Sequence, residues 1–125
     1  MDLAAIALMF FGIEYIYGGN NPTVGLDCSA LTCEALRSIG KLDKKDYSAQ
    51  MLFNKFISDS QNGEIKRNTI LFFGRNSTLV SHVAIAIDEN LMIEAGGEGR
   101  EASDKGYVRI RPISNRSDFL VGVNL

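Results

Sequence analysis

Apolar positions in the first part of the chain recur at helical spacing. The stretch from Leu3 to Ile13 is apolar and follows Asp2, whose carboxylate can accept hydrogen bonds from the first amides of a helix. We therefore expect a first helix over 2–11, weakened at Gly12. The stretch is about half as long as a membrane span, which predicts a core helix and no membrane insertion. Because no Lys or Arg precedes it, no signal peptide is expected.

The clearest helical pattern runs from Cys28 to Ile39. Asp27 precedes it as a good N-cap, and Gly40 follows it as a good stop. The apolar residues that share one side of this helix, and that we expect to be buried, are Leu31, Ala35, Leu36 and Ile39. The turn-rich segment 18–25 is expected to be a loop, and a third, short helix is expected over 48–57.

From about residue 65 the pattern changes to short segments rich in β-branched and aromatic residues, bounded by Gly, Asn, Asp or Pro. These segments predict strands over 69–73, 80–87, 91–95, 107–111 and 119–123. Helices followed by antiparallel strands form an α+β fold in which the helices pack on one sheet. The Gly-rich stretch 96–99 is expected to be a mobile loop.

Composition narrows the class of protein. A chain of 125 residues predicts a single domain over 1–125, and 46% hydrophobic with 22% charged residues is typical of a compact globular protein. The net charge of -2 and the scattered basic residues argue against nucleic acid as a partner. One His and two Cys cannot supply the four ligands of a structural zinc ion, so no metal site is expected. Cys28 and Cys33 diverge by roughly 140° on one helix, so no disulfide between them is expected.

Two residues stand where catalytic groups are often found. Cys28 lies in the first turn of its expected helix, where the helix dipole and free amides favour a reactive thiolate. The alternative is that Cys28 is a small buried apolar residue. His82, the only histidine, begins the apolar segment 83–87 and is either a general base or a polar residue at the surface.

The position of Glu94 depends on the loop between two strands. A three-residue loop, Asp88–Asn90, would pair 87 with 91, 84 with 94 and 82 with 96, so Glu94 would share a face with His82. A two-residue loop would turn Glu94 to the opposite face. A Cys-His-Glu triad therefore requires a loop with an odd number of residues. The alternative is a Glu that faces solvent near the end of a hairpin.

Four segments, in this order along the chain, resemble the motifs of the NlpC/P60 cysteine peptidases. They are Tyr-Ile-Tyr-Gly-Gly at 15–19, Gly-Leu-Asp-Cys-Ser-Ala at 25–30, Ser-His-Val-Ala-Ile at 81–85 and Met-Ile-Glu-Ala at 92–95. The resemblance implies a papain-like α+β fold and hydrolysis of peptidoglycan stem peptides or muropeptides without a cofactor. The usual bond in this family joins D-γ-glutamate to a diamino acid such as diaminopimelate.

The resemblance also implies a role for individual residues. It makes Cys28 the nucleophile, His82 the general base and Glu94 the residue that orients the imidazole. It assigns Tyr15 to stabilisation of the oxyanion. It assigns three residues to the substrate: Tyr17, Asp27 and Ser29. Of these, Asp27 and Ser29 contact the free amino end of the stem peptide.

The chain departs from the family pattern at three places. Ala30 stands where a Gly is usual, and Asn68-Thr69-Ile70 stands where the family has Gly-Asp-Leu. Glu94 occupies a position that is often His. A carboxylate there favours the imidazolium form, so we expect it to move the active pH range upward.

Other functions are compatible with the same motifs. An amidase or an acyltransferase could use the same residues, and a non-catalytic module of a phage tail or secretion apparatus could keep the fold. Without a signal peptide, the expectation is synthesis in the cytoplasm and delivery to the cell envelope by another system or in a phage virion.

Overall fold

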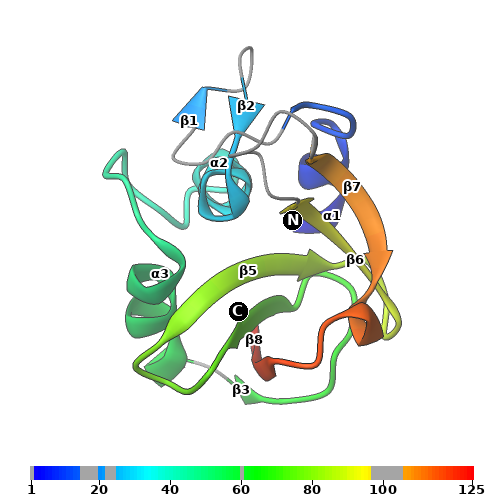
Figure 1. Cartoon of the computed structure of the whole chain (residues 1–125). Coiled ribbons are helices and arrows are strands. Elements are labelled where there is room, and N and C mark those ends of the chain that lie inside the picture. The colour runs from blue at the N-terminus through cyan, green and yellow to red at the C-terminus, as the bar shows by residue number, and fades with distance from the viewer. Residues whose placement is uncertain (1, 15–19, 22–24, 60, 97–105) are drawn as a thin grey trace.

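The computed structural model describes residues 2–14, 20–21, 25–59, 61–96 and 106–125. In this part of the chain, three α-helices pack on a six-stranded antiparallel sheet (Figure 1). The helices are α1 (Leu3–Leu8), α2 (Cys28–Ser38) and α3 (Ala49–Phe56). The sheet order is β3 (Gln61–Asn62), β8 (Phe119–Asn124), β4 (Ile70–Gly74), β5 (Val80–Ala86), β6 (Leu91–Gly96) and β7 (Tyr107–Pro112). The expected α+β fold is confirmed.

Several smaller elements complete the fold. β1 (Asn20–Asn21) and β2 (Gly25–Leu26) form a separate two-stranded ribbon ahead of α2, and two 3₁₀-helices span Ile57–Asp59 and Ile113–Asn115. None of the helices in the described ranges has the length and apolarity that a bilayer crossing demands.

The main core lies between the helices and one face of the sheet. It joins Leu31 and Leu36 of α2 and Phe53 of α3 to alternate strand residues such as Phe72 and Ile85. A smaller cluster on the opposite face contains the intervening residues: Leu71, Phe73, Ala84, Ala86, Met92 and Ile113. Because side chains alternate along a strand, His82 and Glu94 point to the face of this smaller cluster.

The expected boundaries of α2, α3 and the five longer strands are correct to within one residue. The N-caps have the expected chemistry, since Asp27 Oδ1 accepts a hydrogen bond from the Ala30 amide at 2.9 Å and Ser48 Oγ accepts one from Met51 at 3.2 Å. In α2, the predicted stripe is buried except at Ile39, which is half-buried.

The first helix is shorter than expected. It ends at Leu8 rather than near Phe11, although Asp2 caps it as expected. Gly12, with φ of 89°, donates its amide proton to the Val108 carbonyl, and Val108 donates to Ile13. The chain therefore leaves the helix to pair with β7.

The two-residue strands β1, β2 and β3 were not predicted, because two residues are too short to show an alternating pattern. β1 and β2 lie at the ends of what was expected to be a plain loop. The predicted mobile loop over 96–99 lies outside the described residues, apart from Gly96, which ends β6.

Candidate active site

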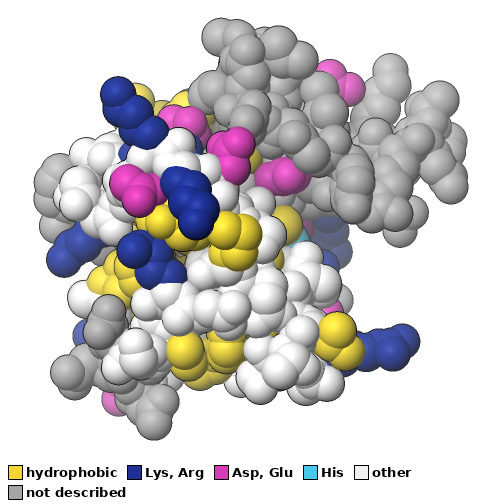
Figure 2. All heavy atoms as spheres, turned by 90° about the vertical axis from the view of Figure 1, so that its left-hand side faces the viewer, with side chains coloured by type: hydrophobic (Ala, Val, Ile, Leu, Met, Phe, Trp, Pro, Cys, Tyr) yellow, Lys and Arg dark blue, Asp and Glu magenta, His cyan; other side chains and the backbone are white. Residues whose placement is uncertain are grey.

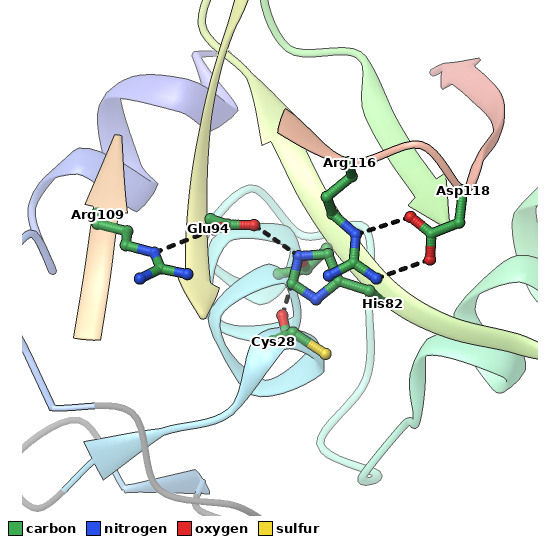
Figure 3. A network of polar contacts seen from close by, with 7 residues as sticks. Cys28, His82, Glu94, Arg109, Arg116 and Asp118 are labelled. Carbon is green, nitrogen blue, oxygen red and sulfur yellow. Dashed lines mark hydrogen bonds and ion pairs between the residues drawn. The ribbon is translucent and has the colours of Figure 1, made fainter. Parts of the chain in front are cut away.

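Cys28 begins α2 and lies against β5. The Asp27 carboxylate that caps the helix also accepts a hydrogen bond from Ser29 Oγ at 3.0 Å, which fixes the first turn. The thiol lies near the backbone amide of Val83, and Figure 3 shows Cys28 beside the His82 ring. β5 and β6 are not paired at His82, so the start of α2 lies beside the ring there although His82 points away from the face that the helices cover. Cys28 and Cys33 are both free thiols, as expected.

His82 connects Cys28 to Glu94. Its side chain is buried, and its Nε2 lies 2.8 Å from Glu94 Oε1. Nδ1, the other ring nitrogen, lies on the side of the ring that faces Cys28 (Figure 3). The ring is thus oriented with one nitrogen available to the thiol and the other occupied by the carboxylate.

The register that places Glu94 beside His82 follows from the three-residue loop. Ile85 pairs with Ile93 and Ala86 with Met92, and the Ile87 amide donates to the Leu91 carbonyl. This is the predicted register. The ladder between β5 and β6 contains only those two pairs, so the expected backbone pairs of 84 with 94 and 82 with 96 do not form, and the contact there is made by side chains.

Arg109 was not predicted as part of the site. It is the direct partner of Glu94 in the ladder between β6 and β7, and its Nε donates to Glu94 Oε2 at 3.1 Å. The two oxygens of Glu94 therefore face two different groups. Finding Arg109 from the sequence would require the register across the long connection 97–106, which no hairpin rule supplies.

A second pair of charges lies near His82 and was also not predicted. Arg116 and Asp118, in the connection to β8, form a bidentate ion pair at 2.9 and 2.8 Å. The Arg116 guanidinium lies 5.2 Å from the centre of the Phe73 ring, which in turn lies 5.4 Å from the His82 ring. Figure 3 shows this pair on the side of His82 away from Arg109.

The expected thiolate at Cys28 is wrong for the resting protein. Removal of the thiol from water raises the pKa of Cys28 to about 11. The backbone amides of Val83 and Ser29 and the charge of Arg116 lower that pKa, but Asp27 raises it further. The helix N-terminus therefore does not outweigh burial, and the thiol is protonated near neutral pH.

Cys33 has the same raised pKa of about 11, again mainly through burial. Its side chain points into the core, where Sγ lies 3.8 Å from the Tyr47 carbonyl. The two cysteines are therefore distinguished by their neighbours and not by acidity. Only Cys28 has a histidine beside it.

Glu94 is ionised in spite of its burial. Burial raises its pKa, but the hydrogen bonds and charges of His82 and Arg109 outweigh this and hold the pKa below its usual range. A buried carboxylate with a partner on each oxygen is a stable orienting group for an imidazole.

The predicted substrate-binding residues are only partly covered by the structure. Tyr15 and Tyr17 lie outside the described residues. Asp27 and Ser29 line a cavity of about 350 Å³ between α2 and α3, which Arg37 and Tyr47 also line. On the face of the molecule shown in Figure 2, acidic and basic side chains lie next to one another. Asp27 and Ser29 therefore combine a structural contact with access to this cavity, which Cys33 also lines.

The arrangement can perform acyl transfer. A thiol beside an imidazole, with a carboxylate on the far nitrogen, is the usual set of groups for nucleophilic catalysis by cysteine. The Cys28 amide lies at the start of a helix, where backbone N–H groups can stabilise an oxyanion.

Comparison with known proteins supports this interpretation. The model of the NlpC/P60 family matches residues 12–115. The chain is 30% identical over 112 residues to the bifunctional muramidase/DL-endopeptidase CwlT of Bacillus subtilis (strain 168). That match covers 86% of this chain and 33% of CwlT, so the chain spans about a third of that protein.

Solved structures show the same fold. The NlpC/p60 domain of the peptidoglycan hydrolase SagA has a TM-score of 0.70 and 22% identity, over 98% of this chain and 96% of that one. RipD of Mycobacterium tuberculosis, described as a non-catalytic NlpC/p60 domain protein adapted to peptidoglycan binding, has a TM-score of 0.72 and 18% identity, over 98% and 94%. With the family model matched over most of its length, this chain belongs to the NlpC/P60 family.

Proposed function

We propose that the protein is a cysteine endopeptidase that hydrolyses peptidoglycan stem peptides at the bond between D-γ-glutamate and a diamino acid. The observation that carries the proposal is the series formed by Cys28, His82 and Glu94, in which Nε2 of the ring is held at 2.8 Å by the carboxylate. Membership of the family and the DL-endopeptidase activity in the name of CwlT support the substrate and the bond.

The raised pKa of Cys28 determines how the reaction begins. Since the thiol is protonated at rest, His82 Nδ1 removes its proton as the sulfur attacks the scissile carbonyl. The carbon–sulfur bond forms, and negative charge develops on the carbonyl oxygen. The Cys28 amide at the helix start stabilises this charge, with Tyr15 as the proposed second donor.

Collapse of the intermediate breaks the peptide bond, and the imidazolium gives its proton to the leaving amine of the diamino acid. His82 then removes a proton from water, which attacks the thioester and releases the peptide acid. Glu94 does not exchange a proton in this scheme. It holds the ring in one orientation and stabilises the imidazolium in both steps.

The same proposal assigns the free amino end of the stem peptide to Asp27 and Ser29, with Tyr17 as a further contact. Asp27 already accepts two hydrogen bonds within α2, so its carboxylate is held in place before substrate binds. A preorganised carboxylate suits an ammonium group, because little ordering is then needed on binding.

A second candidate is binding of peptidoglycan without hydrolysis. It is favoured by the similarity of fold to RipD, which is described as non-catalytic. An amidase or acyltransferase on the same residues is the other alternative. These candidates differ in their products: a binding protein releases none, an amidase cuts a different bond, and an acyltransferase releases the same amine but joins the acyl group to an acceptor other than water.

The test is incubation of the purified protein with intact sacculi and with a defined L-Ala-D-γ-Glu-diaminopimelate peptide, followed by mass spectrometry. We expect cleavage at the γ-glutamyl bond by the wild type and by Cys33→Ala, and none by Cys28→Ala. Cys33→Ala is the matched control because its thiol is equally weak as an acid but has no histidine beside it. Binding without cleavage would favour the second candidate, and a different product would identify the alternative enzyme.

A further inference from the structure

Arg109 ends a line of charged groups that begins at the His82 ring. Its Nε contacts one oxygen of Glu94 at 3.1 Å, while the other oxygen contacts His82 Nε2 at 2.8 Å. The Glu94 side chain is 4% exposed and that of Arg109 is 25% exposed. One nearly buried carboxylate thus lies between two cationic or titratable groups (Figure 3).

The sheet is built to hold this ion pair. Glu94 and Arg109 are direct partners across β6 and β7. Gly96, two residues from Glu94, leaves open the space that the pair needs. A methyl group at 96 would lie 2.7 Å from Glu94 Oε2 and 2.9 Å from Arg109 Nη2, closer than these atoms can approach without moving.

The other described groups around His82 add little net charge. From α2 comes the protonated thiol of Cys28, and from β4 the uncharged ring of Phe73. From the connection to β8 come Arg116 and Asp118, which neutralise each other as a bidentate pair. Among the described residues, the charge in direct contact with the imidazole is therefore that of Glu94, and the cation that contacts Glu94, apart from the ring itself, is Arg109.

We propose that Arg109 is a positioning residue whose guanidinium offsets the charge of Glu94, so that this carboxylate orients His82 without holding it in the protonated form. A buried carboxylate alone, in contact with an imidazole, strongly favours the imidazolium. The catalytic meaning rests on the proposed function, in which His82 must first accept a proton from Cys28. Arg109 would thus make Glu94 suitable for a position that is often His in the family.

The test uses the fact that His82 is the only histidine in the chain, so its Hε1 signal in proton NMR is assigned without ambiguity and can be followed with pH. We expect Arg109→Gln to raise the pKa of His82 by about one unit, because a positive charge is removed close to the carboxylate. Arg111→Gln is the matched control. Arg111 lies on the same strand opposite Met92, and its replacement should move the His82 signal far less.

A double variant separates charge from structure. Glu94→Gln alone should lower the pKa of His82, since Arg109 is then uncompensated, whereas adding Arg109→Gln to Glu94→Gln should raise it again toward the wild-type value. The double variant contains no unpaired charge at these two positions, so it decides the question even if Arg109→Gln does not fold. An unchanged or lowered pKa in Arg109→Gln, or no return in the double variant, would overturn the proposal.

The readout does not depend on activity. If the protein does not hydrolyse stem peptides but the variants show these changes in the pKa of His82, the proposed function fails and the electrostatic role of Arg109 stands. If it hydrolyses them and the pKa of His82 does not change in this way, the role of Arg109 fails and the function stands. In the active enzyme, the acidic limb of the pH-rate profile of Arg109→Gln should move upward together with the pKa of His82, because His82 must be neutral to accept the thiol proton.

Discussion

At the scale of single residues, the site depends on neighbours more than on intrinsic reactivity. Cys28 is no more acidic than Cys33, because burial raises the pKa of each thiol to about 11. What Cys28 has in addition is His82 beside it, and what His82 has is Glu94 at 2.8 Å. In the proposed mechanism each group therefore depends on the next one.

Glu94 should be important through both its shape and its charge. Glu94→Gln keeps a hydrogen-bond acceptor for His82 and loses the charge, so we expect about a tenfold loss of kcat/KM and an acidic limb of the pH-rate profile that moves to lower pH. Glu94→Ala frees the ring to rotate and should lose about a hundredfold or more. The measurement is kcat/KM for the defined peptide from pH 5 to pH 9. Full activity of the Ala variant would mean that another residue orients His82.

At the scale of elements, α2 positions Cys28, the proposed nucleophile, and Asp27 fixes the start of α2. Asp27→Ala removes the acceptor for Ala30 and Ser29, so it should cost about 1 kcal/mol in the free energy of unfolding and also reduce activity. Asp2→Ala is the control, because Asp2 also caps a helix, α1, and carries no site residue with it, although its carboxylate forms an ion pair with Arg67 as well. Urea unfolding and peptide hydrolysis of both variants check this.

We expect Asp2→Ala to lose a similar amount of stability with hydrolysis retained. Equal activity losses in the two variants would show that the effect of Asp27 is general destabilisation. Retained activity in Asp27→Ala would show that the cap does not control the position of Cys28.

The elements that could be predicted are those with a long pattern. α2 has caps at both ends and a continuous apolar stripe, and the five longer strands have clear boundaries. The loop Asp88–Asn90 is short enough for hairpin rules, so the shared face of His82 and Glu94 was predictable. The early end of α1 was not, because it depends on Gly12 pairing with Val108, far away in the sequence.

The parts of the site that escaped prediction depend on tertiary packing. Arg109 joins Glu94 through a register set beyond a long connection, and Arg116 reaches the site from the other side through its contact with Phe73. Burial also outweighs the expected effect of the helix N-terminus on the pKa of Cys28. The extent of this burial depends on how tightly the first turn of α2 packs against the sheet.

At the scale of the whole molecule, one sheet brings together residues that lie far apart in the chain. Cys28 comes from a helix packed on the sheet, while His82, Glu94 and Arg109 come from three neighbouring strands. Stability and site geometry are therefore linked. The ion pairs of Glu94 connect neighbouring strands of the sheet and also orient the residues of the site.

This link predicts how stability depends on pH. Because the pKa of Glu94 is lower in the folded protein than its ordinary value of 4.5, its ionised form stabilises the fold above about that pH. This contribution is lost as the pH falls through the lower, folded-state value. Glu94→Gln should therefore be less stable than the wild type at pH 6 to 7, and the difference should shrink on acidification below pH 4.5.

Urea unfolding of the two proteins between pH 3 and pH 7 measures this difference. A gap that stays constant over this range would mean that the ionised carboxylate does not contribute to stability.

The central claim is that Cys28 and His82 act as one catalytic unit. The most direct test is to measure kcat/KM for the defined peptide with Cys28→Ala, with His82→Ala and with the double variant. Residues that act as a unit have strongly non-additive effects. We expect each single variant to lose at least a thousandfold and the double variant to lose no more than either. A single variant that folds and keeps more than about a tenth of wild-type activity, or losses that multiply in the double variant, would contradict the claim.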